Sequence, residues 1–479
     1  MAPSSVPVAV VGGSVAGLST ALFLARRGHR VTVLEKDATP TPATAAEAGT
    51  WRRRATPQAA HSHAFLARSR AILAQEAPEV LATLAEAGVR EARLAQVPPD
   101  GLGALVPAAG DDDLVVLNAR RSTFEWALRR AAERAPGVDL RLGVGVEGVE
   151  VEADELRRVT GVLTDAGPVA ADVVVDAGGK RSPVRGWAGV ADDPVVEGDG
   201  PTPRVVPCGI TYLTRFYRLR GAEPTPLNRG YTHGASYDRY SCLVFPADDG
   251  AFSLTFGVLP EDRDMRALRD PAAFDAAVAA IEDVAPWGDP DVAEPTSEVA
   301  TMANLQNLLR PWVRGEPLGL HVVGDARSVT NPAHTRGTTL ALATALHLAE
   351  AVDAHPGDVG AQTEAMAAFT SDELAAWVED SVGQDADRLA RWRPGTDPEP
   401  PLWRHRLTNG QAYLAAQRDP TAWRAFTRLQ STLARPAEVL DDPTVVAAAE
   451  EVAASGWRPA RGAAPDHDDL VARARSVSA

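Results

Sequence analysis

A glycine-rich turn near the start of the chain has the residue types and the spacing to hold a diphosphate. It contains Gly12, Gly13, Ser14 and Gly17, after an apolar run at residues 6–11 and before a helical pattern rich in Ala and Leu. Gly12 permits a tight turn after the first strand, and Gly17 lets the helix pack closely on the sheet. The unpaired N–H groups at the start of that helix would face the phosphates. The pattern therefore predicts dinucleotide binding.

A carboxylate completes this unit. Glu35 stands at the end of a second apolar run, where its side chain can accept hydrogen bonds from a ribose. Ser14 replaces the second glycine of the usual Gly-x-Gly-x-x-Gly pattern, and serine is small enough for the backbone to approach a phosphate. The alternative is a turn that uses its glycines for shape alone. Two apolar runs, a helix and an acid in register favour binding of a dinucleotide.

A second polar group follows a later apolar run. Gly324 and Asp325 end that run, and Pro332 lies in the loop before a helical pattern that starts at about Gly337 and Thr338. Pro332 fixes the geometry of the loop. The helix start directs unpaired N–H groups and a partial positive charge outward, toward a ligand that gains negative charge. The alternative to a ligand-binding role for Asp325 is a structural role as a helix cap or a turn residue.

The elements that must position these residues follow from hydrophobic periodicity. Up to about residue 190, apolar runs alternate with helical patterns, which indicates an α/β architecture. Residues 205–259 alternate with period two, which is typical of antiparallel strands with one covered face. The predicted helices span 78–87, 122–134 and 338–353, and the predicted strands lie within 138–151, 159–175 and 319–325, with hairpin-like turns in the first two.

The tail after about residue 363 reads as helical. Its tryptophans have irregular spacing, which is more typical of core or interdomain packing than of a cofactor site. They are Trp377, Trp392, Trp403, Trp423 and Trp457. Residues 458–479 are predicted to be partly disordered.

Composition excludes several classes of protein. The 479 residues carry a net charge of −16, which argues against nucleic acid or an anionic membrane as the main partner. No apolar stretch is long enough to span a bilayer. The two cysteines, Cys208 and Cys242, support neither a disulfide framework nor a cysteine-based zinc site. We expect a cytoplasmic protein.

Four sequence blocks together resemble the FAD-dependent monooxygenases of the aromatic-hydroxylase type, closest to the actinobacterial epoxidase-like oxidoreductases of secondary metabolism. The blocks are the opening unit, the segment 57–66 with His61 and His63, the helix start 120–125 with Arg121, and the segment 324–339. The resemblance implies that FAD is the cofactor and that Arg121 reaches it. It also implies that Asp325 binds the ribityl or ribose hydroxyls, while the loop with Pro332 and the helix start at Gly337 present amides to the flavin ring.

The chain departs from this family at two positions. Gly178 stands where the family has an aspartate in a block that links FAD and NAD(P)H binding, whereas Gly179, Ser182 and Arg185 are kept. Reduction by NAD(P)H is therefore expected either directly or through a partner flavin reductase. Thr335 replaces a glycine of the flavin loop, which is expected to narrow the pocket near the ring.

Three histidines are candidates for the catalytic pocket. If the segment around His61 and His63 is extended, both side chains face the same way, with Ser62 opposite. The alternative for His63 is a buried, satisfied histidine. His334 lies in the predicted flavin loop, where its side chain can contact substrate. No Ser-His-Asp order and no His-x-x-x-His spacing supports a hydrolase or a metal site.

The resemblance implies a monooxygenase that acts through a flavin C4a-hydroperoxide, by epoxidation or hydroxylation, on an apolar or aromatic small-molecule substrate of secondary metabolism such as antibiotic biosynthesis. The alternatives are a flavin dehydrogenase or reductase without oxygen insertion and a flavin-dependent halogenase. The halogenases have a Trp-x-Trp-x-Ile-Pro segment, which this sequence lacks, and a pocket lysine, for which it offers no obvious candidate.

The predicted fold is a Rossmann-like FAD-binding domain with an inserted, mostly antiparallel substrate sheet and a C-terminal helical subdomain. We expect the FAD-binding domain to take residues 1–200 and 301–360. The substrate sheet is expected at 201–300 and the helical subdomain at 361–479.

Overall fold

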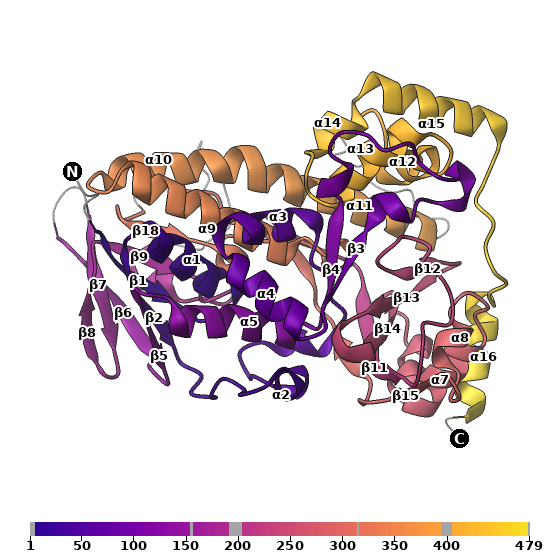
Figure 1. Ribbon diagram of the computed structural model, residues 1–479, viewed down its shortest axis with the longest axis horizontal. Coiled ribbons are helices and arrows are strands. Elements are labelled where there is room, and N and C mark those ends of the chain that lie inside the picture. Colours follow the sequence, from indigo (N-terminus) through magenta and orange to yellow (C-terminus); the bar gives the residue numbers. More distant parts are fainter. Residues whose placement is uncertain (1–4, 154–156, 191–203, 314–315, 394–404, 478–479) are drawn as a thin grey trace.

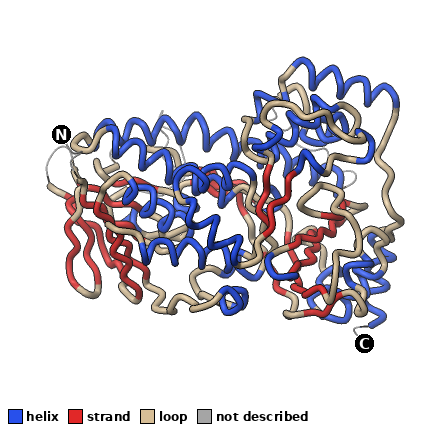
Figure 2. Tube along the Cα trace, in the orientation of Figure 1, coloured by secondary structure: helices blue, strands red, loops and turns tan. Residues whose placement is uncertain are grey.

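The computed structural model describes residues 5–153, 157–190, 204–313, 316–393 and 405–477 (Figure 1). The described chain is a mixed α/β protein with a Rossmann-like part and a separate antiparallel sheet. Two groups of strands lie toward opposite ends of the long axis, and helices cover and connect them (Figure 2). This architecture confirms the predicted fold class.

The Rossmann-like part is built on a five-stranded sheet with the order β18-β9-β1-β2-β5, in which all neighbours are parallel. The strands are β1 (Pro7–Val11), β2 (Arg30–Glu35), β5 (Val138–Leu142), β9 (Val173–Asp176) and β18 (Leu320–Val322). Their Val-rich sequences suit a sheet that is covered on both faces. The glycine-rich turn follows β1, at the carboxyl edge where such sheets bind ligands.

Alternate residues of these strands enter two different cores. Val8, Val10 and Val33 pack with helical residues such as Leu18 and Phe124. The helices of this core include α1 (Val15–Arg26), α3 (Ala67–Glu76), α4 (Pro78–Glu86), α5 (Arg121–Arg134), α9 (Gly337–Ala354) and α10 (Val359–Phe369).

On the opposite face, Ala9 and Val174 pack with Val162 of a three-stranded antiparallel sheet. That sheet contains β6 (Val146–Val151), β7 (Val159–Thr164) and β8 (Gly167–Ala170). The hairpin-like turn expected within 138–151 is wrong. β5 pairs with β2 of the parallel sheet, whereas β6 pairs with β7.

The second sheet is antiparallel, as the period-two pattern predicts. Its strands are β11 (Thr211–Leu219), β12 (His233–Ser236), β13 (Tyr240–Pro246), β14 (Ala251–Val258), β15 (Ala293–Pro295) and β16 (Ala300–Met302). Its apolar face, with Phe252, Leu254 and Phe256, packs on α7 (Pro271–Ala279) and α8 (Ala285–Gly288). The other face presents Thr214, Ser253 and Thr255 to the segment after η1 (Pro57–Ala60).

Smaller elements join the two halves. They are α2 (Ala45–Thr50), α6 (Val184–Trp187), the ribbon of β3 (Arg90–Arg93) and β4 (Val115–Asn118), and a three-stranded sheet of β10 (Arg204–Pro207), β17 (Gln306–Leu309) and β19 (Ser328–Val329). The β3–β4 ribbon lies beside the C-terminal helices (Figure 1). There Leu94 and Val116 share a core with Trp423.

The C-terminal region is helical, as predicted. Its helices are α11 (Ala375–Trp392), α12 (Asn409–Ala416), α13 (Pro420–Gln430), α14 (Pro436–Leu440), α15 (Pro443–Ser455) and α16 (His467–Val477). A π-helical turn at Thr370–Leu374 joins α10 to α11. Trp377, Trp392 and Trp423 are buried and Trp457 is half-buried, whereas Trp403 lies outside the described residues.

The expectation of disorder at 458–479 is wrong for α16. This helix crosses to the antiparallel sheet and packs on α7, with Leu470, Val471 and Ala474 in the same core as Phe274. In the sequence, charged residues surround these three apolar positions, so the short amphipathic stripe of the helix is difficult to recognise. Among the described helices, none is long and apolar enough to cross a membrane. The predicted domain boundaries stay predictions.

Candidate functional site

The glycine-rich turn is as tight as its sequence requires. Gly12 has φ +107°, and a Cβ there would lie 2.5 Å from the carbonyl oxygen of Ala177. A Cβ at Gly17 would lie 1.9 Å from the carbonyl oxygen of Gly12. Both positions therefore need glycine, because any side chain would push α1 away from the sheet. The start of α1 carries no side-chain cap, which leaves its first N–H groups available to a ligand.

Ser14, instead of capping α1, joins a polar network. Its hydroxyl donates to Glu125 Oε2 at 2.9 Å and accepts from Arg121 Nη2 at 3.2 Å. Arg121 also donates to Thr338 Oγ1 at 3.3 Å, so it connects the first turns of α5 and α9 with the glycine-rich turn. This network brings together Ser14, Arg121 and Thr338, three candidates that are far apart in the sequence.

Glu35 is buried at the end of β2 and is already engaged. Its Oε2 accepts from the Gly13 amide at 2.8 Å and pairs with Arg53 Nη2 at 2.8 Å, and its Oε1 accepts from the Asp37 amide at 2.8 Å. Each carboxylate oxygen accepts about two hydrogen bonds, so Oε1 keeps one position for a ribose hydroxyl.

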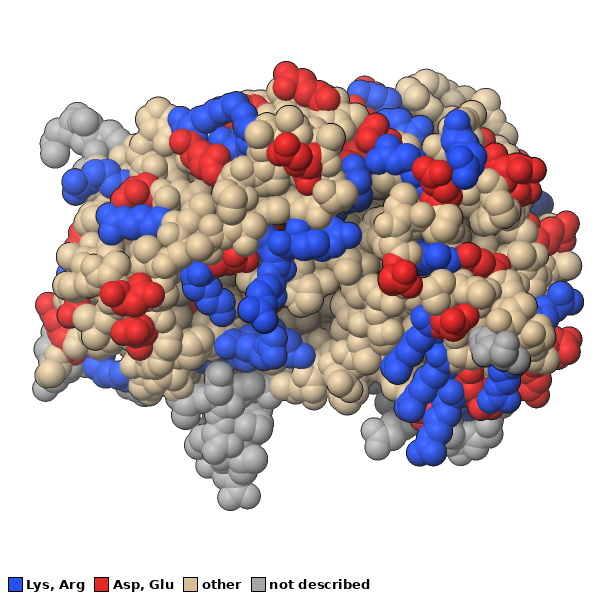
Figure 3. Space-filling model, turned by 90° about the horizontal axis from the view of Figure 1, so that it is seen from below, with Lys and Arg blue, Asp and Glu red and all other residues tan. Residues whose placement is uncertain are grey.

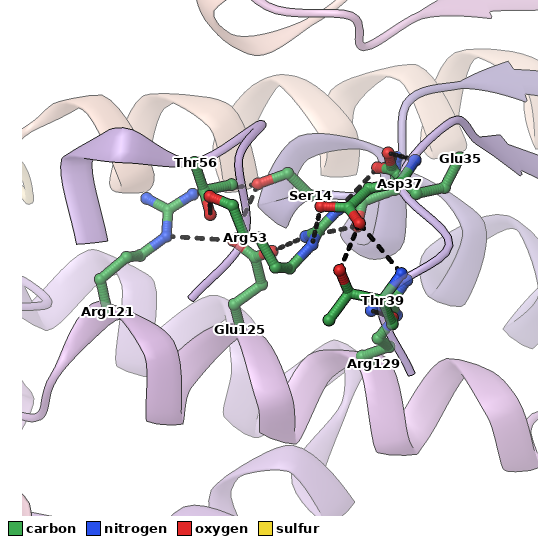
Figure 4. Close-up of polar contacts among 10 residues, drawn as sticks. Ser14, Glu35, Asp37, Thr39, Arg53, Thr56, Arg121, Glu125 and Arg129 are labelled. Atoms are coloured by element: carbon green, nitrogen blue, oxygen red, sulfur yellow. Dashed lines mark hydrogen bonds and ion pairs between the residues drawn. The ribbon is translucent and has the colours of Figure 1, made fainter. Parts of the chain in front are cut away.

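Sequence reasoning missed Arg53, which lies between Glu35 and Glu125 (Figure 4). Burial lowers the pKa of this guanidinium, but Glu125, Glu35 and Asp37 outweigh burial and raise the pKa above its ordinary value. Only the run of three arginines at 52–54 marks the place in the sequence. Arg53 points inward, whereas Arg52 and Arg54 are exposed.

Asp325 lies in the turn η7 (Gly324–Ala326), directly after β18. Gly324 has φ +60° there, and a Cβ on it would meet Ala16 of α1 at 2.7 Å. The Asp325 side chain is accessible, yet burial raises the pKa of its carboxyl, against the opposing effects of Arg121 and Lys180. Among the described residues, no hydrogen-bond donor reaches this carboxyl.

The predicted flavin loop runs from β19 to α9. Asn331 is fully buried, while Pro332 and Ala333 are exposed in the short helix η8 (Pro332–His334). Thr335 has φ +54°, a left-handed conformation that costs a β-branched residue on the order of 1–3 kcal/mol. This conformation explains why a glycine suits the position.

The helix α9 that follows this loop begins at Gly337. Its start has no side-chain cap, and a Cβ at Gly337 would meet open space. α9 packs beside α1, so two uncapped helix starts lie in one part of the molecule.

The three candidate histidines make different contacts. His61 Nδ1 lies 3.0 Å from Thr214 Oγ1 of β11, and burial lowers the pKa of His61 to about 4. Ser62 also contacts this sheet, through Ser253 and Thr255 at 2.7 and 2.6 Å. The expected opposition of Ser62 to His61 is therefore wrong.

His63 has a fixed tautomer. Its Nδ1 lies 3.0 Å from the carbonyl oxygen of His61, which can only accept, so Nδ1 carries the proton. Burial, assisted by the charge of Arg121, lowers the pKa of His63 to about 3. The ring is therefore neutral at pH 7, and its Nε2 offers a lone pair. His63 is half-buried.

His334 lies at the other side of the loop, toward α11. Its Nε2 is 3.9 Å from Asp385 Oδ1, and burial lowers its pKa to about 4. The structure therefore does not gather the three histidines into one hydrogen-bonded cluster.

In the block around Gly178, where the family that the chain resembles has an aspartate at position 178, the acid of this chain is Asp176. Asp176 Oδ1 accepts from the Gly178 amide at 2.9 Å and from Ser182 Oγ at 2.6 Å. A Cβ at Gly178 would lie 2.7 Å from Ser182 Oγ, so an aspartate at 178 does not fit beside this bond. Gly179 has φ +81°, and Arg185 pairs with Glu316 at 2.8 Å.

These residues fit a flavin dinucleotide. The tight turn and the uncapped start of α1 suit a diphosphate, and the free acceptor position of Glu35 suits a ribose. The accessible carboxylate of Asp325, which has no donor among the described residues, suits hydroxyl groups of a ligand. The open start of α9 leaves room for a ring system. The described residues contain no cluster of side chains that would hold a metal ion.

Comparison with known proteins gives the same picture. A family model described as FAD dependent oxidoreductase matches residues 7–97, and comparison with curated proteins found no match. PqsL of Pseudomonas aeruginosa, classed with FAD-dependent monooxygenases, has a TM-score of 0.57 at 18% identity, over 81% of this chain and 98% of its own.

Two further solved structures share the fold. The flavin-dependent brominase Bmp2 has a TM-score of 0.61 at 17% identity, over 95% of this chain and 100% of its own. A flavoprotein/dehydrogenase from Cytophaga hutchinsonii has a TM-score of 0.61 at 16% identity, over 94% of this chain and 100% of its own. Likeness at this level shows the fold, which serves several flavin chemistries. The family model matches residues 7–97, and the similar structures show that the rest of the chain has a fold found in flavin-dependent enzymes.

Proposed function

We propose that this oxidoreductase is a monooxygenase that transfers one atom of O2 to a small organic molecule by epoxidation or hydroxylation. The observation that carries the proposal is the accessible carboxylate of Asp325, which no donor among the described residues reaches, together with Arg121 and the uncapped starts of α1 and α9. We further propose that the enzyme is of the epoxidase-like kind, with a role in secondary metabolism such as antibiotic biosynthesis and a cytoplasmic location. The sequence blocks described above support this finer assignment.

The proposed cofactor contacts divide between two regions. Gly12, Gly13, Ser14, Gly17 and Glu35 would hold the ADP half. Toward the flavin half, the contacts would come from Arg121, Gly324, Asp325, Pro332, Gly337 and Thr338. When bound and reduced, FAD reacts with O2 and supplies the oxygen atom for transfer, and the second oxygen atom leaves as water.

The protein's own groups would orient the reactants and stabilise charge. The positive end of α9 would stabilise negative charge on the neighbouring edge of the flavin ring. His63 is neutral, and its Nε2 can accept a hydrogen bond from a donor in the pocket. We propose His63, His334 and His61 as the pocket histidines, in that order, because His61 is already bonded to Thr214.

We propose that the substrate is apolar or aromatic and lies between the flavin loop and the sheet residues 211–256. Thr214, Ser253 and Thr255 give this sheet face a polar centre, and His61 and Ser62, which contact it, directly precede the proposed pocket histidine His63 in the chain.

For the electron supply we propose NAD(P)H, either bound directly or used by a partner flavin reductase. The contacts of Asp176 with Gly178 and Ser182 support the second route, because they fill the place of the family's aspartate. The test is NADPH oxidation by the purified chain with and without an added flavin reductase. Rapid oxidation by the chain alone would contradict the reductase route.

Two alternatives keep the same cofactor. A dehydrogenase or reductase would consume substrate without consuming O2 in equal amount. A halogenase would need a pocket lysine, and of the two lysines in the chain Lys180 is bonded to Gln306 at 2.7 Å. Adding bromide or chloride during turnover and analysing products by mass distinguishes halogen insertion from oxygen insertion.

The first experiment is the flavin spectrum of the purified protein. We expect a yellow protein, or a colourless one that takes up FAD. A folded protein that binds no FAD would overturn the proposed function. Incorporation of one ¹⁸O atom from labelled O2 into product would support it.

A further inference from the structure

The predicted flavin loop, residues 331–336, begins with a buried side chain, Asn331, that contacts the protein interior. Its backbone N–H faces Asn307 Oδ1 at 2.9 Å and Ser381 Oγ at 3.1 Å. Its Oδ1 accepts from Tyr212 Oη at 2.8 Å and from the Ala333 amide at 3.0 Å. These two donors fix the orientation of the Asn331 amide, so its Nδ2 must point the other way.

The group that receives this Nδ2 is Asp385 of α11. Asp385 is almost fully buried, and its Oδ1 accepts from Asn331 Nδ2 at 2.5 Å. Its Oδ2 accepts from Asn307 Nδ2 at 2.8 Å, and Arg388 Nη1 donates to Oδ1 at 2.7 Å. Both oxygens therefore face amide donors. A carboxylate meets this requirement, whereas an asparagine has only one acceptor oxygen.

The other end of the loop has a second anchor on the same helix. Asp380 pairs with Arg336, which also lies over the Trp377 ring at 4.7 Å. All three residues are buried. The segment 331–336 is thus fixed at both ends by carboxylates of α11, and its exposed part, Pro332 and Ala333, lies between them.

We propose that Asp385 is a positioning residue for the reaction. It fixes Asn331 and thereby sets where the loop and the start of α9 stand against the flavin ring. Through Tyr212, which belongs to β11, the same asparagine links the position of the loop to the antiparallel sheet. This proposal rests on the proposed function, since it assigns a flavin to the exposed side of the loop.

The substitution Asp385→Asn tests the role of the carboxylate directly. It keeps the shape of the side chain but places an NH2 group against the Nδ2 of either Asn331 or Asn307. We expect FAD to dissociate at least tenfold more readily from this variant. We also expect the visible absorption bands and the reduction potential of the bound flavin to shift. The measurements are titration of the apoprotein with FAD and the spectrum and potential of the complex.

A matched control separates positioning from general loss of stability. Glu76→Gln weakens another buried carboxylate contact, with Arg27 at 2.7 Å, at the end of α3. We expect it to lower the melting temperature without changing the flavin spectrum or potential. A second arm exchanges the two groups in Asp385→Asn/Asn331→Asp, which restores the amide–carboxylate pair between positions 331 and 385 and leaves the contacts of Arg388 and His334 with residue 385 unmatched. We expect this double variant to recover part of the affinity for FAD.

The outcomes are distinguishable from failure of the proposed function. Wild-type protein that binds no FAD would overturn the proposed function itself. Wild-type protein that binds FAD, with Asp385→Asn unchanged in affinity, spectrum and potential, would overturn only the role of Asp385. Equal effects of Asp385→Asn and Glu76→Gln would also overturn it.

Discussion

At the scale of single residues, Asp325 is the candidate site carboxylate that lacks a hydrogen-bond donor among the described residues. Its carboxylate is accessible, burial raises its pKa, and no donor among the described residues reaches it. A group that only capped a turn would have its hydrogen bonds within the protein. The sequence predicts a ligand site here because a strand, an acid, a proline and a helix start follow each other in the order found in the family that it resembles.

We expect Asp325→Ala to weaken FAD binding at least tenfold, about 1.4 kcal/mol, because it removes hydrogen bonds to a charged acceptor. Titration of the apoprotein with FAD measures this effect. The control is Asp139→Ala, which removes an exposed acid of β5 in the same half of the molecule. Unchanged affinity in Asp325→Ala would contradict the assignment of the Gly324–Asp325 turn.

The histidines make stability depend on pH. Burial lowers the pKa of His63 to about 3 and those of His61, His321 and His334 to about 4, from 6.5 in the unfolded chain. Below pH 6.5 the unfolded chain therefore binds more protons than the folded protein. By linkage, the free energy of unfolding falls as the pH falls from about 6.5 to about 4.

We expect His63→Gln to reduce this pH dependence, because it removes one of the histidines whose pKa burial lowers. Urea unfolding between pH 7 and pH 4.5 measures the slope. Ser62→Ala is the control, since it changes the neighbouring residue without removing a titrating group. A slope that is the same in His63→Gln and wild type would show that His63 does not take up a proton on unfolding.

At the scale of elements, periodicity predicted those helices and strands whose pattern is local. The opening βαβ unit, α4, α5, α9, β11 and β14 agree with the sequence, because the apolar pattern that marks each of them lies within its own segment. The contacts of Arg53, Asp176 and Asp385 could not be predicted from the sequence. Each depends on a partner that tertiary folding brings from another element, and nothing in the spacing of the chain names that partner.

The helix α16 gives a test at this scale. Leu470 is fully buried against α7, far from the flavin loop, and the exposed Val477 lies on the same helix. We expect Leu470→Ala to lower the free energy of unfolding by about 2–5 kcal/mol. Val477→Ala should change it by less than about 0.5 kcal/mol. Denaturant unfolding compares the two, and equal effects would show that α16 does not dock on α7.

At the scale of the whole molecule, the charge is unevenly distributed. The chain has a net charge of −16, yet Lys and Arg side chains gather around a hollow on one face (Figure 3). Arg52 and Arg54 flank the inward-pointing Arg53 and are exposed. Partial burial lowers the pKa of Arg52, and the neighbouring positive charge of Arg120 lowers it further. Local charge of this kind raises the concentration of an anion at the site, even on an acidic protein.

The sign of the salt effect decides whether local or total charge governs the capture of FAD, whose diphosphate is anionic. If the arginines guide it, salt screens an attraction and association slows between about 0.02 and 0.3 M NaCl. If the net charge governs, salt screens a repulsion and association becomes faster. We expect slowing, measured by stopped-flow quenching of FAD fluorescence with apoprotein. Arg52→Gln/Arg54→Gln should reduce the salt dependence, whereas Arg473→Gln, an exposed arginine on α16, should leave it unchanged. Faster association at high salt would show that Arg52 and Arg54 do not steer the cofactor to its site.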